Sequence, residues 1–332
     1  MRKITIIIDS KLFAYTQHQR YKPIIGLIDE VARFILIAKD KLNLTQDEML
    51  NKKTIWAMDT GIPIRADMLK KYKANRKEKA KKLDRYEQER LEKFKTLYPK
   101  LEGVFGKLGI AISIDRVEAD DIASIIAYNK QPDEVVIMIS SDRDWTKFLK
   151  DNNTYIINPS KKGLMYNRTG VLSVMGWTPT QKVVIDAFCG VKKEDIQGID
   201  WLGYKTFNKK VWDKLDDKYK ASEDYETVVK KCAMIIEKYD VLTPRMLASI
   251  PDGSSAGQVA MANLKLTTPF TSTKELVDAG VTADVTKLEE AIKKPHGFRT
   301  VEFKTLAQEL NKVGQPVKMP EPEALKAFNI LI

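Results

Sequence analysis

The segment ITIIID, from Ile4 to Asp9, decides the fold class of this chain. A short run of β-branched residues is typical of a strand buried on both faces of a parallel sheet, and this run ends in an acid, Asp9. The runs Thr54–Met58, Ile110–Ile114 and Val135–Ile139 have the same character, and Tyr155–Ile157 is a fifth candidate. We therefore predict a sheet that starts at the N-terminus.

Helical patterns separate these runs. Two apolar stripes recur at intervals of three and four residues; they are Leu27, Val31, Phe34, Ile35 and Ala38, and then Leu91, Phe94, Tyr98, Leu101, Phe105 and Leu108. Pro99 is predicted to end one helix and to open the next. Strands that alternate with helices in this way predict a parallel sheet covered by helices, which is an α/β fold.

The pattern changes after about Gly176, where strand-like runs stop. Helices are predicted at 210–218, 225–238, 285–293 and 300–311. We therefore predict an α/β domain over residues 1–178, a mostly helical domain over 179–270, and a helical tail over 271–332 to which the pattern assigns no role.

Composition excludes several classes of protein. The chain has 332 residues, of which 43% are apolar and 30% are charged, as is ordinary for a globular protein. Its two cysteines cannot form a disulfide framework, and no apolar run approaches the roughly 18 residues of a membrane span. We expect a cytoplasmic protein without a signal peptide or a membrane partner.

The net charge of +11 is concentrated in one stretch. Residues 65–100 hold fourteen Lys and Arg against six Asp and Glu, a local excess of +8. One interpretation is a solvated helix face. The other is a binding element for a polyanion, because basic patches release the counterions condensed on nucleic acids.

Acidic residues follow each of the first four predicted strands. In chain order they are Asp9, Asp59, Glu118, Asp120, Asp121, Asp142 and Asp144. Because the carboxyl ends of parallel strands converge on one crevice, we expect these acids to lie together. They could not all stay ionised there without cations, so divalent ions such as Mg²⁺ or Mn²⁺ are expected.

Other interpretations explain fewer of these residues. Asp120 or Asp142, taken alone, could be a helix N-cap. The two histidines, His18 and His296, form no zinc motif, and no phosphate-binding glycine loop follows a strand. A haloacid-dehalogenase-like phosphatase would need an acid at position 11, where this chain has lysine.

A set of motifs resembles the flap endonuclease/5′–3′ exonuclease family, especially the stand-alone phage exonucleases and the 5′-nuclease domains of bacterial DNA polymerases. The motifs are Ile7-Ile8-Asp9, Met58-Asp59, Arg65 with Tyr72-Lys73-Ala74-Asn75-Arg76, Val117-Glu118-Ala119-Asp120-Asp121, and Ser140-Ser141-Asp142-Arg143-Asp144-Trp145. The resemblance covers residues 4–210. It implies a PIN-like nuclease core with a basic helical arch at about 65–100, followed by a helix–hairpin–helix-type DNA-binding region.

The resemblance also implies roles for the acids. A first Mg²⁺ would be held by Asp9, Asp59, Glu118 and Asp120, with Asp142 near both ions, and a second would be supported by Asp121, Asp144 and Glu194. Two ions about 4 Å apart can hold a scissile phosphate and activate a water molecule. Mn²⁺ would substitute for Mg²⁺.

Basic residues of the motifs are implied to contact DNA. Arg65, Lys73 and Arg76 match the base of the family's arch, where they would contact the reacting phosphate. Tyr72 would stack on a terminal base or, alternatively, pack at the base of the arch. The arch itself, from 77 to 95, would steer a 5′ single strand by its positive field, to which Lys77, Lys79, Lys81 and Lys82 contribute.

The stretch from Gly198 to Thr206 resembles the family's glycine turn, which grips duplex DNA. The matching residues are Gly198, Gly203, Lys205 and Thr206. Glycine at such a turn lets backbone N–H groups approach a phosphate. The turn sometimes holds K⁺ in the family, but Asp200 and Trp201 replace its proline and one glycine here, which argues against the ion.

The chain departs from the family just before this turn. The family pattern Gly-Asp-x-x-Asp-Asn-Ile reads Gly190-Val191-Lys192-Lys193-Glu194-Asp195-Ile196 here. Valine cannot bind a metal, so the second ion has one carboxylate fewer, and Asp186 and Asp195 are candidates to compensate. We predict a weakened second metal site in an active enzyme.

The sequence thus predicts a Mg²⁺-dependent, structure-specific 5′-nuclease, acting as a 5′–3′ exonuclease or flap endonuclease in replication, primer removal or repair. We expect a monomer that acts on DNA with 5′ flaps, nicks or ends, with RNA–DNA hybrids as further candidate substrates. Two alternatives stay open. One is a nucleic-acid-binding protein of this fold with weakened or lost catalysis, and the other is an RNA-preferring PIN-like ribonuclease.

Overall fold

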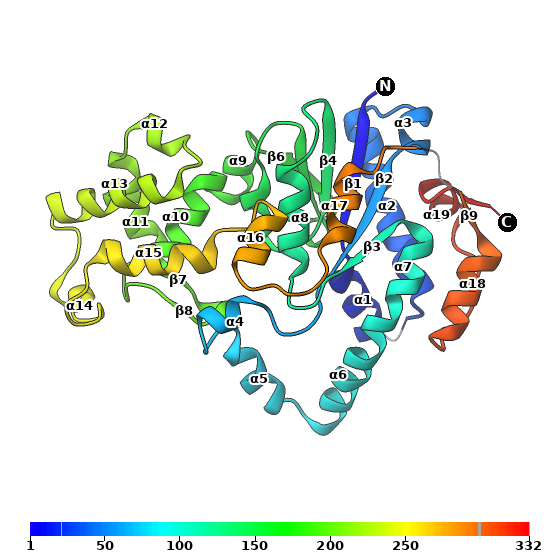
Figure 1. The fold of residues 1–332 in the computed structure, drawn as a ribbon, viewed down its shortest axis with the longest axis horizontal. Helices are drawn as coiled ribbons and strands as arrows, with labels where there is room; N and C mark the ends of the chain where they lie inside the picture. The colour runs from blue at the N-terminus through cyan, green and yellow to red at the C-terminus, as the bar shows by residue number, and fades with distance from the viewer. Residues whose placement is uncertain (21, 298–299, 332) are drawn as a thin grey trace. The chain divides into compact units, whose positions relative to one another are not determined.

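The computed structural model describes residues 1–20, 22–297 and 300–331. The chain divides into two compact units, and neither is continuous in sequence (Figure 1). Unit 1 consists of Met1–Ile64, Asp84–Gly170 and Phe270–Ile332, and unit 2 of Arg65–Leu83 and Val171–Pro269. The C-terminal tail therefore belongs to unit 1, and the first part of the predicted arch belongs to unit 2.

Unit 1 is built on a six-stranded sheet in the order β3-β2-β1-β4-β5-β6. Five strands run parallel, and the last pairs antiparallel with its neighbour: β1 (Lys3–Asp9), β2 (Lys53–Met58), β3 (Ile110–Ser113), β4 (Glu134–Ile139), β5 (Thr154–Asn158) and β6 (Leu164–Asn167). The five predicted strands and the α/β fold are confirmed. The sequence did not predict β6, which has four residues, of which only Tyr166 is buried.

Burial on both faces explains why the apolar runs became strands. Every residue of β2 and β4 is buried. Alternate residues Ile4, Ile6 and Ile8 of β1 join an apolar core with α2 and α7, while α8 lies in front of the sheet in Figure 1. The helices of this part are α1 (Ser10–Gln19), α2 (Ile25–Leu42), α3 (Gln46–Leu50), α6 (Arg85–Leu97), η1 (Tyr98–Leu101), α7 (Glu102–Leu108), α8 (Ala119–Tyr128), η2 (Arg143–Phe148) and η3 (Pro159–Lys161).

The C-terminal segment completes the core of unit 1. Its elements are α16 (Thr273–Asp278), α17 (Thr286–Lys293), β9 (Val301–Glu302), α18 (Phe303–Lys312), α19 (Pro322–Ala327) and β10 (Ile330–Leu331). Leu306, Leu310 and Phe328 belong to the same apolar core as β1 and α2. The predicted helices at 285–293 and 300–311 correspond to α17 and α18, except that residues 301 and 302 form a strand.

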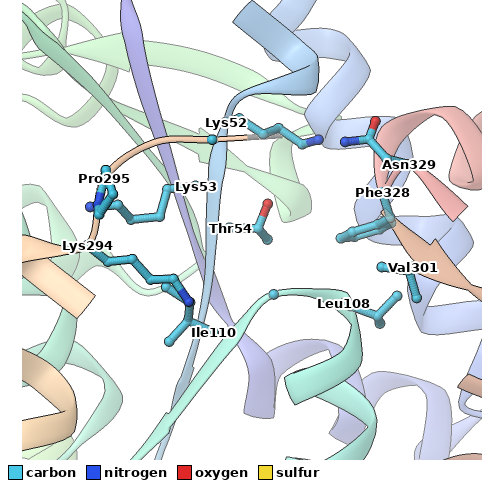
Figure 2. Close-up of a pocket in the computed structure, with 12 residues that line it drawn as sticks. Lys52, Lys53, Thr54, Leu108, Ile110, Lys294, Pro295, Val301, Phe328 and Asn329 are labelled. Atoms are coloured by element: carbon cyan, nitrogen blue, oxygen red, sulfur yellow. The ribbon is translucent and has the colours of Figure 1, made fainter. Parts of the chain in front are cut away.

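A pocket of about 280 Å³ lies between this segment and the start of β2. Figure 2 shows Lys52, Lys53 and Lys294 around it. The Nζ of Lys52 donates to the carbonyl oxygen of Met49, and that of Lys53 donates to the carbonyl oxygen of Ala291. These two ammonium groups thus stabilise the C-terminal ends of α3 and α17, because helix ends leave carbonyl groups without intrahelical partners.

Unit 2 is mostly helical, as predicted. Its elements are α4 (Arg65–Met68), α5 (Ala74–Lys81), α9 (Val171–Met175), α10 (Pro179–Cys189), β7 (Gly190–Val191), η4 (Lys192–Glu194), β8 (Ile196–Gln197), α11 (Tyr204–Lys210), η5 (Trp212–Lys214), α12 (Asp217–Lys220), α13 (Tyr225–Lys238), α14 (Pro244–Leu247) and α15 (Ala256–Thr267). Helix 225–238 is confirmed, but the helix predicted at 210–218 is wrong. Val211 and Leu215 leave helical geometry there, so that Trp212 and Leu215 reach the core of the unit.

The stretch predicted as an arch, residues 65–100, contains α4, α5 and α6, which are separated by non-helical connections at 69–73 and 82–84. Asp84 caps the first turn of α6 by accepting the N–H of Glu87, and Pro99 opens η1 directly after α6, as predicted. The division between the two units falls between Leu83 and Asp84. Among the described residues, no helix is long and apolar enough to cross a membrane.

Candidate metal centre at the carboxyl edge of the sheet

The strand order reverses at β1, which creates the crevice of this fold. The chain passes from β1 to β2 and β3 on one side and returns to β4 and β5 on the other. In open parallel sheets, ligands bind outside the carboxyl ends of the strands at such a reversal. Asp9 is the last residue of β1, and Ser140 follows the end of β4.

The first turn of α8 holds the densest group of acids. Carboxylate oxygens of Glu118, Asp120 and Asp121 all lie within 4.8 Å of one another. Glu118 is 8% exposed and Asp121 is 1% exposed. Helix geometry brings the three together, because Glu118 is the N-cap of α8 and the two aspartates occupy its first turn, where the helix dipole favours negative charge.

Asp59 is connected to this group through the start of the same helix. Its Oδ1 accepts the backbone N–H of Ala119 at 2.7 Å. Its Oδ2 lies 3.1 Å from the Nζ of Lys11. The acid after β2 is therefore held beside the acids that follow β3, and one cation already balances part of its charge.

Asp9 is affected by the negative charges of two other acids of the edge. Ser140 donates from Oγ to Oδ2 of Asp9 at 2.8 Å, and the N–H of Asp142 donates to the same Oγ at 3.0 Å. Burial, followed by the negative charge of Asp59, raises the pKa of Asp9 to about 7, and Asp142 adds to the rise. Near neutral pH this carboxyl group thus binds protons unless another cation replaces them.

Asp142 and Asp144 form a short turn after β4. Oδ1 of Asp142 accepts the N–H of Asp144 at 3.0 Å, which is the capping arrangement considered for Asp142 from the sequence. Asp144 is 7% exposed and lies 3.8 Å from the Nζ of Lys147. The seven acids Asp9, Asp59, Glu118, Asp120, Asp121, Asp142 and Asp144 are called the acidic edge below.

Three partners of the acidic edge were not predicted. Ser140 had a detectable signal, since it lies inside a quoted motif, and a hydroxyl beside an aspartate is a common donor. Lys147 had a signal too, because it follows Asp144 by three residues in the same short helix, η2. Lys11 had none, because no spacing rule relates it to Asp59, which follows a different strand. The edge offers only oxygen ligands, and these suit hard divalent cations.

Unit 2 contains the remaining predicted metal ligand, Glu194. It also contains Arg65, Tyr72 and Lys73, which were predicted to contact DNA. Arg65 is 4% exposed and donates from Nη2 to the carbonyl oxygen of Thr268 at 3.2 Å. Lys73 Nζ lies 3.7 Å from Oε1 of Glu194, and the backbone N–H of Lys73 donates to the carbonyl oxygen of Glu194. Tyr72 is 8% exposed, so in this structure it packs inside the protein, which was the alternative to stacking.

Tyr72 packs in a small apolar cluster around Val191. The other buried members are Ile196 and Leu266. Val191 is 8% exposed, so the substituted position faces apolar side chains. The two acids considered as substitutes have other partners: Asp186 pairs with Lys182, and Asp195 Oδ2 accepts the N–H of Asn75 at 2.7 Å.

The predicted DNA-binding residues differ in their exposure. Arg76, Lys79, Lys81, Lys82, Lys205 and Gly203 are exposed, whereas Thr206 and Gly198 are partly buried. The side chain of Lys77 lies outside the described part of the structure. Gly198 is required for packing, because a Cβ there would lie 2.2 Å from the backbone nitrogen of Gly190; at Gly203 a Cβ would meet nothing within 4 Å.

Residues 5–176 match the family described as 5′–3′ exonuclease, N-terminal resolvase-like domain. The chain belongs to this family. It is 27% identical over 209 residues to a 5′–3′ exonuclease of Buchnera aphidicola, covering 62% of this chain and 68% of that protein. It is 26% identical over 246 residues to DNA polymerase I of Streptococcus pneumoniae, covering 71% of this chain but 26% of that enzyme.

Solved structures of a related phage enzyme have the same fold as this family member. The T5 5′-exonuclease with bound zinc has a TM-score of 0.60 and 20% identity, over 88% of this chain and 97% of that one. The T5 flap endonuclease, solved with DNA and metal ions, has a TM-score of 0.59 and 16% identity, over 94% and 100% of the two chains. The predicted family, nuclease function and PIN-like α/β core are therefore confirmed.

Proposed function

We propose that this family member is a Mg²⁺-dependent, structure-specific 5′-nuclease that cuts DNA near 5′ single-strand/duplex junctions. The observation that carries the proposal is the convergence of Glu118, Asp120 and Asp121 within 4.8 Å. Asp59 is hydrogen-bonded to the start of the same helix, and burial, together with the negative charge of Asp59, raises the pKa of Asp9 to about 7. So many acids in one crevice repel each other, and a divalent cation relieves the repulsion.

The oxygen-only donor set fits Mg²⁺, with Mn²⁺ as a substitute, better than it fits zinc. Glu118, Asp120 and Asp59 would hold a first ion together with Asp9. Asp121 and Asp144 would support a second, with Asp142 near both ions. Glu194, predicted for the second ion, pairs with Lys73 in this structure. When bound, such ions would supply Lewis acidity at the scissile phosphate and would lower the pKa of an attacking water molecule.

Neighbouring groups of this chain orient the carboxylates of the acidic edge and offset part of their negative charge. Ser140 fixes the Asp9 carboxylate by donating to Oδ2, and the N–H of Ala119 fixes Asp59. Lys11 beside Asp59 and Lys147 beside Asp144 lower the net negative charge of the edge. Hydrolysis then needs no nucleophilic side chain, and the crevice walls only have to orient water and phosphate.

Basic residues would bind the DNA without reading its sequence. Arg76, Lys79 and Lys82 are exposed and suit phosphate contacts along a 5′ single strand. Lys73 lies beside Glu194 and Arg65 is buried, so contact of either with a reacting phosphate would require a change of partner. We propose DNA with flaps, nicks or ends as substrate, RNA–DNA hybrids as a further substrate, and action as a monomer.

The test is a panel of labelled substrates: a 5′ flap, a nicked duplex, a blunt duplex, an RNA–DNA hybrid and single-stranded RNA. With Mg²⁺ we expect cleavage near the junction of the flap, and with EDTA we expect none. Binding of the flap without cleavage under any divalent ion would instead support a nucleic-acid-binding protein. Preference for single-stranded RNA would support a ribonuclease.

A further inference from the structure

Trp201 in the glycine turn of unit 2 has an unusual conformation. Its φ is +68°, in the left-handed region that side chains with a Cβ rarely adopt. The side chain is nevertheless 61% exposed, whereas Trp56, Trp145 and Trp212 are at most 5% exposed. Neither the backbone conformation nor the exposed ring is favourable for folding, and such outliers are found at functional sites.

The indole ring of this turn residue packs against a cation of helix α14. The guanidinium carbon of Arg245, in α14, lies 3.5 Å from the centre of the ring. The turn and α14 are joined by a hydrogen bond from the N–H of Asp200 to Oγ of Ser249, which in turn donates to the carbonyl oxygen of Met246. The turn and α14 are therefore joined, and the ring and the guanidinium are in contact, before any ligand arrives; such pre-ordering lowers the entropic cost of binding.

The charge around the ring favours a polyanion. The helix that follows the turn, α11, has the sequence YKTFNKK, with three exposed lysines and no acid. Arg245 is also exposed, and Asp200 is the one acid in the turn. Aromatic rings combined with Lys and Arg are typical of nucleic-acid-binding surfaces.

We propose that Trp201 and Arg245 form a contact for the double-stranded part of the DNA substrate, which is an addition to the function proposed above and rests on it. Insertion between two bases needs both faces of a ring, and the guanidinium covers one face of this indole. The ring would instead lie against a deoxyribose, while Arg245 donates to the neighbouring phosphate. The contact is sequence-independent, because sugar and phosphate carry no base information.

Trp201→Gly tests the proposal without endangering the fold, because glycine adopts a positive φ freely. We expect the affinity for a blunt duplex, measured by fluorescence anisotropy in EDTA, to fall about fivefold to tenfold. The melting temperature should stay constant or rise. Arg245→Ala should weaken binding by a similar factor, and the double variant should lose less than the product of the two factors.

A matched control is available in the same unit. Tyr239 is 49% exposed and has the Nζ of Lys214 at 4.3 Å from its ring centre, so it is a second exposed cation–π pair. Tyr239→Ala should leave the duplex affinity unchanged. In the wild-type protein, duplex DNA should also protect tryptophan emission from acrylamide quenching, and the protection should disappear in Trp201→Gly.

Three results would overturn the proposal. They are an unchanged duplex affinity of Trp201→Gly, an equal loss for a single-stranded oligonucleotide, and a lower melting temperature that would make the pair a structural contact. If the wild-type protein cuts a flap while Trp201→Gly binds duplex normally, this inference alone fails. A wild-type protein that neither binds nor cuts DNA would refute the proposed function instead.

Discussion

The acidic edge of unit 1 and the segment 190–203 of unit 2 differ in how they match the family. Every acid of the edge is present in the expected order, and the edge contains three carboxylates within 4.8 Å of one another. In the segment 190–203, valine and tryptophan stand where the family has an acid and a glycine. The first region keeps the carboxylate oxygens that the proposed metal site needs. In the second region, Val191 packs in an apolar cluster and Trp201 is exposed.

The largest effect is expected at the acidic edge. Asp120→Ala should lower single-turnover cleavage of a 5′ flap about a thousandfold, because it removes one proposed metal ligand. Binding of the same flap in EDTA should change little, since affinity comes mainly from basic residues.

Asp133→Ala is the matched control for this prediction. Asp133 is an exposed acid before β4, at the other end of the strand from the edge, and pairs with Lys3 at 3.4 Å. The Asp133→Ala variant should cleave the 5′ flap at the wild-type rate. If Asp120→Ala also kept normal turnover, the chemistry would lie elsewhere.

Val191→Asp should destabilise unit 2 rather than repair a metal site. A carboxylate placed among Tyr72, Ile196 and Leu266 loses its hydration, which we expect to cost about 3 kcal/mol. Urea unfolding measures the cost, with Val191→Ala as the milder comparison. A stable variant that needs less Mg²⁺ for half-maximal cleavage would show that position 191 serves the second ion after all.

A smaller effect is expected in the basic stretch. Changing Lys79, Lys81 and Lys82 together to Gln should lower the slope of flap affinity against salt concentration by up to about three counterions. The control triple variant changes Lys274, Lys304 and Lys326 of the C-terminal segment, which are equally exposed. Equal slopes for both variants would indicate that residues 79–82 are merely a solvated helix face.

The smallest effect is expected at the strand starts of unit 1. Burial alone would raise the pKa of Glu134, but hydrogen bonds from His296 and Thr5 outweigh it and lower the pKa to about 2. The ionised form therefore stabilises the fold above the unfolded pKa of about 4.3, and this contribution is lost as the pH falls toward 2.

Glu134→Gln should reduce stability at pH 7 by about 1–2 kcal/mol, and it should flatten the acid dependence measured by thermal unfolding. An unchanged acid dependence would mean that His296 does not hold the C-terminal segment to the sheet through this carboxylate.

The two regions also differ in what the sequence could predict. The parallel strands were predictable because buried parallel strands are continuous apolar runs. The acidic edge was predictable because the carboxyl ends of parallel strands lie at the same edge of the sheet. The contact of Val191 with Tyr72 and the pairing of Lys73 with Glu194 could not be predicted from the sequence. Each joins two segments that are more than a hundred residues apart in the chain. The prediction of a helix at 210–218 was wrong because the backbone at Val211 and Leu215 is not helical. The apolar spacing that suggested a helix arises here from Trp212 and Leu215, which are buried without an α-helix.

The most direct test of the account is the binding of Mn²⁺ to the protein without DNA, followed by electron paramagnetic resonance. Wild type and Asp133→Ala should bind Mn²⁺ with the same affinity, and Mg²⁺ should compete. The double variant Asp120→Ala/Asp121→Ala should lose that binding while keeping its melting temperature, because repulsion among the acids disappears with them. Unchanged Mn²⁺ binding in the double variant would contradict the assignment of the metal centre to the acidic edge.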